Sequence, residues 1–312
     1  MHAVVFERYG GPEVLENKEV PDPEPGDGEV LVDVEAVGIN YRDVYECAAD
    51  GYGSTPPAIV GVEGAGTVVG TGERVGWVGI PGSYAERIAA PTELLVQVPA
   101  GVSSDTAAAA LLQGMTAHYL THDSYPVQDG DWVLVHAAAG GVGLLLTQMA
   151  KLRGGRVIAT TSTDDKAALA SEAGADHVIG YEGFADSARD LTGGAGMAAI
   201  YDGVGKATFL DGLDALAPTG RMILYGAASG RPDPFDPSLL QSKGSLYLQR
   251  PTLQHYVRGP VLLRDRAAAL FELIGIDAVH VRIGATYPLA DARQAVADLV
   301  GRKTTGKLLL KP

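Results

Sequence analysis

Hydrophobic and polar positions alternate in short stretches over the first hundred residues. Every second side chain of a β-strand faces the same side of a sheet, so such stretches predict strands. The predicted strands are residues 3–6, 30–37, 66–69 and 94–98. Proline and glycine fill the gaps between them, as at residues 21–28 and 52–57. This part of the chain is predicted to be a mostly antiparallel β domain.

The pattern changes near residue 103. Ser103, Ser104 and Asp105 precede an alanine-rich run, which predicts a helix from about Asp105 toward His118. From Asp131 onward, strand-like and helix-like segments alternate. The predicted strands are residues 132–136, 156–161, 177–179, 198–202 and 221–225, and the predicted helices are residues 141–153, 165–173 and 209–217. Such alternation predicts βαβ units and a doubly wound parallel sheet.

The remaining segments follow this sheet in the sequence. They are predicted as a strand at residues 245–249, a helix at 262–274, a strand at 279–283, a helix at 289–301 and an apolar tail at 307–311. The tail suits a last strand that returns to the N-terminal domain, so we expect the parallel-sheet domain to be inserted within the other. The strand at 245–249 could lie at a sheet edge and pair with a second subunit.

Length, charge and cysteine content narrow the class of protein. A chain of 312 residues suggests two domains. With 24 Lys and Arg against 38 Asp and Glu, the net charge of -14 argues against nucleic acid or an anionic membrane surface as a partner. The one cysteine, Cys47, can form neither an internal disulfide nor a cysteine-rich metal centre. Since no apolar run approaches the length of a membrane span either, we expect a cytoplasmic protein.

A glycine-rich turn is the clearest local motif. Residues 137–143 read AAAGGVG, after a predicted apolar strand and before a predicted helix. A dinucleotide diphosphate binds backbone N–H groups at a helix N-terminus, where side chains must be small or absent. Gly140 and Gly143 supply that room, and Ala137 stands where a glycine is frequent. The alternative is that the glycines serve only close packing of helix and strand.

The end of the second predicted strand bears on the choice of dinucleotide. An acidic residue there would bind the ribose diol of NAD and repel a 2′-phosphate. Here the strand ends at Thr161 and Ser162, and Lys166 follows where it could pair with a phosphate. NADPH is therefore favoured over NADH, although Asp164 and Asp165 work against it. The alternative for Lys166 is a solvated helix residue.

Several longer motifs, spread over the whole chain, are more specific than the turn. They are residues 9–15, 37–43, 61–66, 113–117, 136–143, 201–205, 244–247 and 250–253. With them the chain resembles the zinc-free quinone oxidoreductases of the medium-chain dehydrogenase/reductase superfamily, the group that includes ζ-crystallin. The resemblance implies a Rossmann sheet, residues 113–257, that binds NADPH. It would be inserted in a mainly β GroES-like catalytic domain, residues 1–112 and 258–312.

The resemblance also implies the cofactor-binding residues. At the diphosphate it implies Gly140, Gly141, Val142 and Gly143, and around the 2′-phosphate Ser162, Lys166, Tyr181 and Arg302. On the nicotinamide side it implies Asn40, Tyr41, Arg42 and Asp43 with Thr116, Tyr119 and Gly203. The residues that would close over the nicotinamide ribose and ring are Gly226, Ala227, Ser229, Gln249, Arg250 and Pro251. Taken alone, Tyr181 and Arg302 would more often be surface residues.

Zinc dehydrogenases of the same superfamily have metal ligands where this chain has Asn40 and Val62, so we expect no metal. The catalytic candidates are Asn40, Asp43, Tyr45 and Tyr52. Either of these tyrosines could donate a hydrogen bond to a developing oxyanion, and the alternative is a pair of ordinary half-buried aromatics. Asp43 is expected to orient a neighbour and Glu63 to accept structural hydrogen bonds. We expect the cation of Arg42 to favour anionic substrates.

These residues together predict an NADPH-dependent reductase of quinones or similar conjugated carbonyls. The nearest alternative is an NADPH-dependent enoyl or alkenal double-bond reductase, which would also need a proton donor to the α-carbon. A non-catalytic NADPH-binding protein and a zinc alcohol dehydrogenase are further alternatives. The resemblance also implies a homodimer, formed through residues 245–249.

Overall fold

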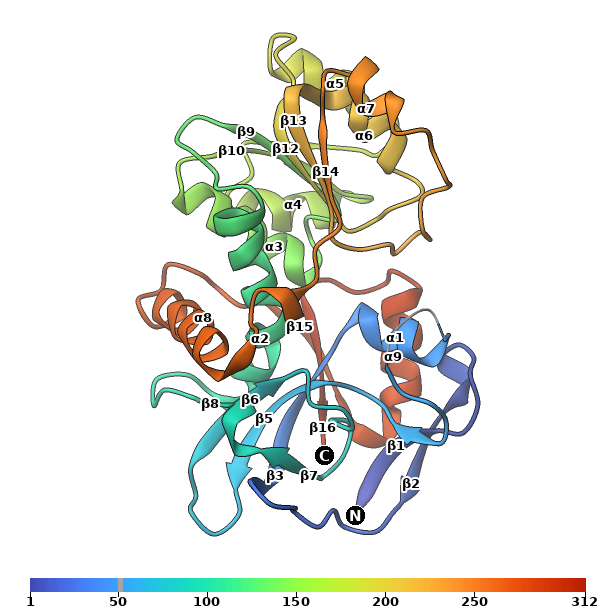
Figure 1. The fold of residues 1–312 in the computed structure, drawn as a ribbon, viewed down its shortest axis with the longest axis vertical. Helices are drawn as coiled ribbons and strands as arrows, with labels where there is room; N and C mark the ends of the chain where they lie inside the picture. Colours follow the sequence, from blue (N-terminus) through green and yellow to red (C-terminus); the bar gives the residue numbers. More distant parts are fainter. Residues whose placement is uncertain (50–52) are drawn as a thin grey trace. The chain divides into compact units, whose positions relative to one another are not determined.

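The computed structural model describes residues 1–49 and 53–312. They form two compact units (Figure 1). Unit 1 comprises Met1–Met115 and Val257–Pro312, and unit 2 comprises Thr116–Tyr256. The second unit is therefore inserted in the first along the chain.

Unit 2 is built on a parallel sheet of six strands. In spatial order these are β11 (His177–Ile179), β10 (Arg156–Thr160), β9 (Trp132–Val135), β12 (Met197–Asp202), β13 (Leu216–Leu224) and β14 (Tyr247–Gln249). The chain builds one half outward from β9 and then returns to add the other half from β12. This order confirms the predicted doubly wound sheet.

Helices cover both faces of this sheet. They are α3 (Gly141–Leu152), α4 (Asp164–Glu172), α5 (Phe184–Leu191), α6 (Phe209–Ala215) and α7 (Ser238–Ser242). Figure 1 shows α5, α6 and α7 grouped on one side of the strands and α3 and α4 on the other. Phe184 and Phe209 pack with Leu134, Ile158 and Ile200 of three neighbouring strands. Since both faces of these strands are covered by helices, the strands carry continuous apolar runs.

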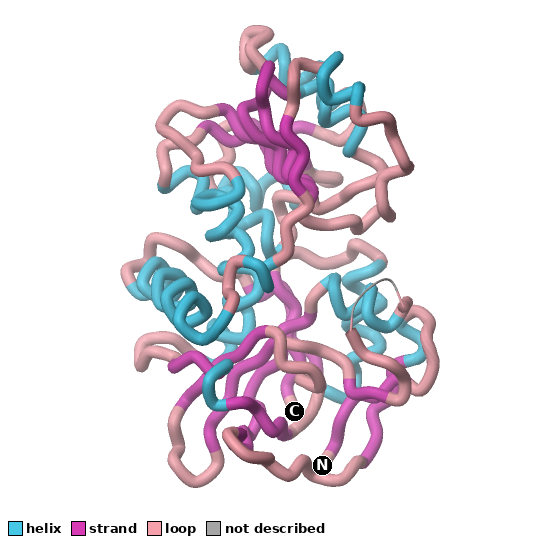
Figure 2. The backbone as a smooth tube through the Cα atoms, in the orientation of Figure 1, coloured by secondary structure: helices cyan, strands magenta, loops and turns pink. Residues whose placement is uncertain are grey.

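Unit 1 is mainly antiparallel β structure, as predicted (Figure 2). Its larger sheet has the order β15 (Ile283–Pro288), β16 (Lys307–Lys311), β3 (Glu29–Ile39), β5 (Glu63–Val68), β6 (Arg74–Val78) and β8 (Leu95–Gln97), with β7 (Arg87–Pro91) also paired to β3. A smaller sheet contains β2 (Leu15–Glu19), β1 (His2–Phe6) and β4 (Ala58–Ile59). β16 runs antiparallel to β3, so the C-terminal tail does return to the N-terminal unit.

The helices of unit 1 flank these sheets. They are α1 (Tyr41–Cys47), the first part of α2 (Ser104–Tyr119), α8 (Gly259–Gly275) and α9 (Ala292–Val300). Short helical turns in unit 1 are η1 (Pro12–Val14), η2 (Thr92–Leu94) and η5 (Leu289–Asp291), and those in unit 2 are η3 (Leu120–Ser124) and η4 (Leu253–His255). The core beneath α1 and α9 includes Trp77 and Tyr84. In the described part of the chain, no helix has the length and apolar character needed to cross a membrane.

Three predicted segments need correction. The strand predicted at residues 279–283 is wrong, because the strand is β15 at Ile283–Pro288, where pairing with β16 fixes it. The helix predicted at residues 209–217 ends at Ala215, since β13 already pairs with β12 at Leu216. The last predicted helix begins with the tighter turn η5.

Candidate functional site

The carboxyl ends of the six parallel strands define one edge of unit 2. Because parallel strands all end at the same edge, the segments that follow them lie together there. The expected cofactor residues that follow β9, β10, β12, β13 or the end of β14 are Gly140, Gly141, Val142, Gly143, Ser162, Lys166, Gly203, Gly226, Ala227, Ser229, Gln249, Arg250 and Pro251. The structure therefore brings these candidates to the edge at which doubly wound sheets bind ligands.

The glycine-rich turn after β9 is closed by its own backbone. Ala137 has a left-handed φ of 52°. A Cβ on Gly143 would lie 2.4 Å from the carbonyl oxygen of Ala137 and 2.7 Å from the Cα of Ala138. Gly143 is thus required by the turn itself, which is the packing role weighed as the alternative. At Gly140 a Cβ would lie 3.2 Å from the same carbonyl oxygen, and this glycine is the N-cap of α3.

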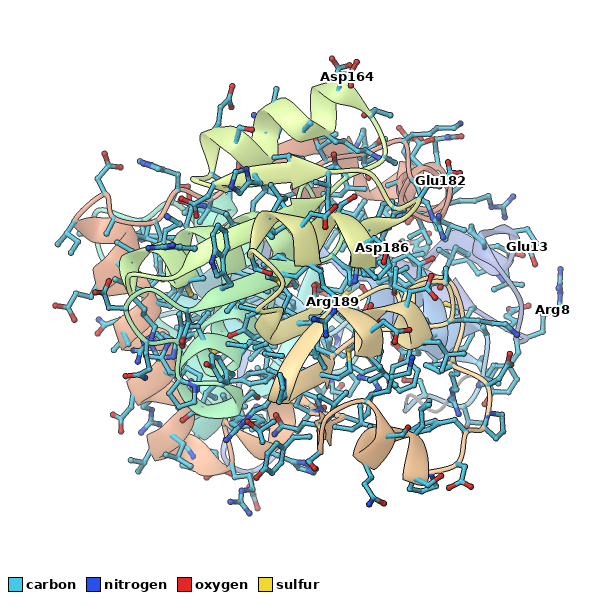
Figure 3. All side chains as sticks on the ribbon, turned by 90° about the horizontal axis from the view of Figure 1, so that it is seen from above. Arg8, Glu13, Asp164, Glu182, Asp186 and Arg189 are labelled. Atoms are coloured by element: carbon cyan, nitrogen blue, oxygen red, sulfur yellow. The ribbon has the colours of Figure 1, made fainter. Side chains whose placement is uncertain are left out.

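The N-termini of α3 and α4 differ in charge and capping. Among the described residues, no side chain caps α3, and no acid lies in its first turn. In α4 the Thr163 side chain accepts from the Lys166 amide, and Asp164 and Asp165 occupy the first turn. Asp164 points away from the ribbon in Figure 3. The bare amides and positive dipole end of α3 fit the diphosphate of a dinucleotide, and those of α4 do not.

Polar groups that suit a 2′-phosphate lie after β10. Lys166 Nζ is 3.5 Å from the hydroxyl oxygen of Ser162, which is exposed. The hydroxyl of Tyr181 accepts a hydrogen bond of 3.1 Å from the amide of Ala137. Tyr181 therefore joins the end of β11 to the glycine-rich turn, and it is more than the surface residue that its sequence position alone suggests.

The segments after β12 and β13 meet backbone to backbone. A Cβ on Gly226 would lie 2.6 Å from the carbonyl oxygen of Gly203, and one on Gly203 would lie 2.8 Å from the ring of Tyr225. The buried Asp202 carboxylate accepts from two amides and from a threonine hydroxyl in the loop after β12, and burial raises its pKa. The Ser229 hydroxyl donates to the carbonyl of Val204 at 2.8 Å. Two glycines that the resemblance assigned to the cofactor thus allow this close approach.

Two tyrosines stack beside the end of β14. The rings of Tyr119 and Tyr256 are nearly parallel, with centroids 4.1 Å apart. Gln249 Nε2 donates to the Tyr256 hydroxyl at 2.8 Å, and Arg250 donates to the carbonyl of Leu224 at 3.0 Å. Thr116 is buried. Tyr225 and Tyr256 were missed from the sequence, where lone tyrosines in loops carry no distinguishing signal.

In unit 1, Asn40 caps α1 and Asp43 lies in its first turn. The Asp43 carboxylate accepts from the backbone N–H of Asn40 at 2.8 Å and from the Tyr84 hydroxyl at 2.9 Å. Burial raises the pKa of Asp43 to about 6. These contacts are in keeping with an orienting role, because the Asp43 carboxylate is hydrogen-bonded to other groups of the protein.

The side chain of Asn40 is held by a buried ion pair. Its Nδ2 donates to Glu63 at 2.7 Å and its Oδ1 accepts from Lys307 at 2.8 Å, while Lys307 Nζ lies 2.6 Å from Glu63. Glu63 also accepts from the Leu112 amide at 2.6 Å. Glu63 is thus a structural acceptor, as expected. Lys307 was missed, although a lysine that opens an apolar strand is an available signal.

The charge of Arg42 is compensated within α1. Its guanidinium lies 2.9 Å from Glu46 and 3.4 Å from Asp43, and both carboxylates are buried. This pairing weakens the expectation that Arg42 selects anionic substrates.

The remaining unit 1 candidates lie at or near α1. Tyr45 packs edge-on against Tyr41, with ring centroids 5.4 Å apart. Arg302 is exposed after α9, and its charge acts on Tyr41, whose pKa is raised by burial. Tyr52 lies outside the described residues.

The residues at the expected zinc position do not suit a metal. Val62 has no donor atom in its side chain, and the amide of Asn40 is hydrogen-bonded to Glu63 and Lys307. Over residues 1–49 and 53–312, no three His, Cys, Asp or Glu side chains are grouped so that they could hold an ion.

Two family descriptions match parts of the chain. Residues 26–79 match the alcohol dehydrogenase GroES-like domain, and residues 141–275 match the zinc-binding dehydrogenase family. The first match confirms the GroES-like expectation for the β-rich unit. The second covers most of the parallel sheet.

Full-length relatives carry more specific names. The chain is 39% identical to a quinone oxidoreductase of Pseudomonas aeruginosa, with 99% of both chains covered, and 37% identical to a 2-haloacrylate reductase of Burkholderia, with 99% and 98% covered. The structure of the Escherichia coli quinone oxidoreductase complexed with NADPH has a TM-score of 0.97 at 34% identity, with all of both chains covered. A mycobacterial protein complexed with NADPH has a TM-score of 0.96 at 46% identity, also over all of both chains.

Proposed function

The chain belongs to the quinone oxidoreductase family of the medium-chain dehydrogenase/reductase superfamily, and on that premise we propose that it reduces quinones or similar conjugated carbonyls with NADPH. The enzyme is an oxidoreductase, and its cofactor is NADPH. The observation that carries this function best is the N-terminus of α3, which has no side-chain cap and no acid in its first turn among the described residues, together with exposed Ser162 and half-buried Lys166 after β10. One supplies donors for a diphosphate, and the other supplies a cation for a 2′-phosphate.

We assign cofactor binding to residues 113–257, and catalysis to residues 1–112 with 258–312. In the first domain Gly140, Gly141 and Val142 would hold the diphosphate through their amides. Ser162, Lys166 and Tyr181 would hold the 2′-phosphate with Arg302 of the second domain. The nicotinamide side would be formed by Asn40, Tyr41, Arg42, Asp43, Thr116, Tyr119, Gly203, Gly226, Ala227, Ser229, Gln249, Arg250 and Pro251.

Bound NADPH supplies a hydride from the nicotinamide ring. The chain's own residues bind and orient the reactants, and a fixed close approach lowers the barrier without a general acid. The phenol of Tyr45 or Tyr52 would donate a hydrogen bond to the oxygen that becomes negative on the quinone. Asp43 and Asn40 would act by holding the first turn of α1, since their side chains are hydrogen-bonded within the protein.

A substrate panel tests the proposal. NADPH oxidation would be followed by its absorbance with 1,4-benzoquinone, 9,10-phenanthrenequinone and a series of 2-alkenals. We expect turnover with the quinones and a higher kcat/KM for NADPH than for NADH. Absence of turnover with every quinone, despite measurable NADPH binding, would leave a non-catalytic binding protein and overturn the proposal.

Reduction of a conjugated double bond is the second candidate, because one full-length relative is a 2-haloacrylate reductase. Haloacrylates are carboxylates, so an uncompensated cation beside the substrate would favour them. The ion pairs of Arg42 with Glu46 and Asp43 favour neutral quinones instead. If Arg42→Gln lowers kcat/KM for 2-chloroacrylate and leaves that for 1,4-benzoquinone unchanged, the second candidate gains over the first.

The enzyme would form a homodimer through the segment at residues 245–249. β14 lies at the edge of the unit 2 sheet, and its residues Tyr247 and Leu248 are exposed. An exposed apolar edge strand can pair with a copy of itself. Sedimentation velocity would show a dimer, and Leu248→Lys would shift it toward monomer.

The buried, unbridged Cys47 is compatible with a reducing compartment, which supports a cytoplasmic location.

A further inference from the structure

Three polar side chains from distant parts of the sequence meet in the interior of unit 1. Lys307 opens β16, Glu63 opens β5 and Asn40 caps α1. Their exposed fractions are 1%, 0% and 3%. Lys307 Nζ donates to both partners, at 2.6 Å to Glu63 and 2.8 Å to Asn40. The group is therefore a closed triangle of hydrogen bonds with one buried positive and one buried negative charge.

The triangle fixes the orientation of the Asn40 amide. Its Oδ1 accepts from Lys307, while its Nδ2 donates to Glu63 and to the carbonyl of Gly38 at 3.0 Å. An ammonium group only donates and a carboxylate only accepts, so the amide cannot be flipped without two repulsive contacts. With its donors and its acceptor engaged in this way, Asn40 serves as an anchor for the backbone that follows it.

The backbone that Asn40 anchors is the first turn of α1. The backbone N–H of Asn40 donates to the Asp43 carboxylate, as in a capping box at this end of the helix. Tyr41, Arg42 and Tyr45 project from the same turns of α1, and the proposed function assigns them to the nicotinamide side. Rotating or shifting Asn40 would therefore move these side chains as a group.

The same carboxylate also holds a second helix. Glu63 Oε1 accepts from the Leu112 amide of α2 at 2.6 Å, while its Oε2 binds Lys307 and Asn40. Gly38 allows this approach, since a Cβ there would lie 2.5 Å from Glu63 Oε2. One ion pair thus joins β5, β16, α1 and α2. Apolar side chains of similar volume could pack these elements together without burying charges.

We propose that Lys307 is a positioning residue for hydride transfer, acting through Glu63 and Asn40 to fix the first turn of α1. Lys307 itself does not touch the reactants. The inference rests on the proposed function, because it gives the turn of α1 a task beside the nicotinamide. A purely structural pair would support stability alone, whereas a positioning pair also controls the geometry of the reaction.

Charge-removing variants separate these two roles. Lys307→Met alone leaves the Glu63 carboxylate buried without its cation, which strongly destabilises the fold. The double variant Glu63→Gln with Lys307→Met removes both charges at nearly constant volume and frees the Asn40 amide to flip. Lys307→Arg keeps the charge with a different shape. Lys311→Met is the matched control. Lys311 lies on the same strand and is also ion-paired, to Asp105, but both of these side chains are half-exposed.

Three measurements are made on each folded variant. Calorimetry gives the Kd for 2′,5′-ADP, which has the adenosine and 2′-phosphate of NADPH but no nicotinamide. The fluorescence lifetime of bound NADPH reports how tightly the nicotinamide ring is held. Stopped-flow oxidation of NADPH and of 4-deuterated NADPH by 1,4-benzoquinone gives the rate of the hydride step.

For the double variant we expect a Kd for 2′,5′-ADP within about twofold of wild type, a shorter nicotinamide lifetime and a hydride step about 10- to 100-fold slower. Lys307→Arg should lose less, and Lys311→Met should match wild type in all three measurements. A folded double variant with an unchanged lifetime and hydride rate overturns the proposal, and so does an equal loss in 2′,5′-ADP binding. If the double variant does not fold, Lys307→Arg decides by the same criteria. If wild type oxidises NADPH with no quinone, the proposed function fails, while the lifetime still decides the positioning role.

Discussion

Charged groups are handled in opposite ways in the two units. In unit 1, buried Lys307 pairs with Glu63 and half-buried Arg42 pairs with Glu46 and Asp43, so that each charge has a partner of opposite sign. At the carboxyl edge of unit 2, Ser162 is exposed and Lys166 is half-buried, and the N-terminus of α3 has no side-chain cap among the described residues. One unit completes its own electrostatics, and the other presents donors that a ligand can use.

The difference follows from what each region has to do. An anion site must keep its donors available, because the phosphates supply the compensating charge when they bind. A framework that fixes side chains must satisfy its polar groups internally, because a buried charge without a partner is costly. The same kinds of residue therefore act as ligand contacts in unit 2 and as internal supports in unit 1.

Removing one member of the buried pair should have the largest effect. Lys307→Met leaves Glu63 uncompensated and should lower the free energy of unfolding by about 3–5 kcal/mol. The double variant with Glu63→Gln should lose clearly less. Urea unfolding in a Trp132→Phe background, where buried Trp77 reports on unit 1, checks this. Equal losses in the single and double variants would show that the charge pair is not what matters.

Acid should weaken unit 2 through His136. This ring is fully buried, its Nδ1 lies 2.8 Å from the Thr160 hydroxyl, and burial lowers its pKa from 6.5 to about 3. A depressed pKa means that the folded state resists protonation, so stability is complete above pH 6.5 and falls as the pH drops toward 3. Relative to His136→Asn, wild type should lose about 2 kcal/mol between pH 6.5 and 4.5.

The matching measurement follows unit 2 by Trp132 fluorescence in a Trp77→Phe background. His136→Asn can keep a hydrogen bond to Thr160 and has no titrating group. Parallel pH profiles of wild type and variant would contradict the burial of a neutral imidazole.

Asp43 should give unit 1 the opposite pH dependence. Its pKa is raised from 3.8 to about 6 by burial, so the folded state favours the protonated form. The stability that this provides is present below pH 3.8 and is lost as the pH rises through 6. Relative to Asp43→Asn, wild type should lose about 3 kcal/mol over that range. Trp77 fluorescence during urea unfolding at several pH values checks the slope, and a difference that rises with pH would contradict it.

A methyl group on Gly143 should disturb the glycine-rich turn. The added Cβ would lie 2.4 Å from a backbone oxygen that cannot rotate away. Gly143→Ala should cost about 1–3 kcal/mol of stability and weaken NADPH binding. Calorimetry measures the Kd, with Gly180→Ala as the control because that position is open. Unchanged affinity in the folded variant would separate the turn from the diphosphate.

Loss of the Lys166 charge should have the smallest effect. Exposed ion pairs contribute about 1 kcal/mol at most, so Lys166→Gln should weaken NADPH binding about fivefold. NADH binding should not change, since NADH has no 2′-phosphate. Titration of both nucleotides tests this, and equal losses for NADH and NADPH would rule out Lys166 as the group that discriminates.

Much of unit 2 was predictable because its signals are local. The strands His177–Ile179 and Arg156–Thr160, the helix Gly141–Leu152 and the glycine-rich turn all follow from apolar runs and turn residues close together in the sequence. Helix α1 was missed, since seven residues with polar caps show no clear period. β15 was displaced, because only its pairing with β16 decides which residues form the strand.

The residues of the candidate site also fall into those that local sequence patterns predict and those that only the fold brings together. Gly140, Ser162 and Lys166 could be proposed from the order of strand, turn and helix. The partners of Asn40 could not, because Lys307 is 267 residues away and no local pattern indicates that the two meet. The contact of Tyr181 with the Ala137 amide likewise depends on how two strands lie side by side.

The amino-acid sequence alone determined the alternation of strands and helices, the position of the phosphate-binding turn and the absence of an acid at the end of β10. These are properties of neighbouring residues, set by side-chain period, backbone freedom and charge. Tertiary structure decided which carboxylate holds which cation, which glycine closes a turn and which tyrosine meets a backbone amide. Such choices depend on contacts between residues far apart in the chain, where burial makes a correct partner necessary and only the fold brings that partner within reach.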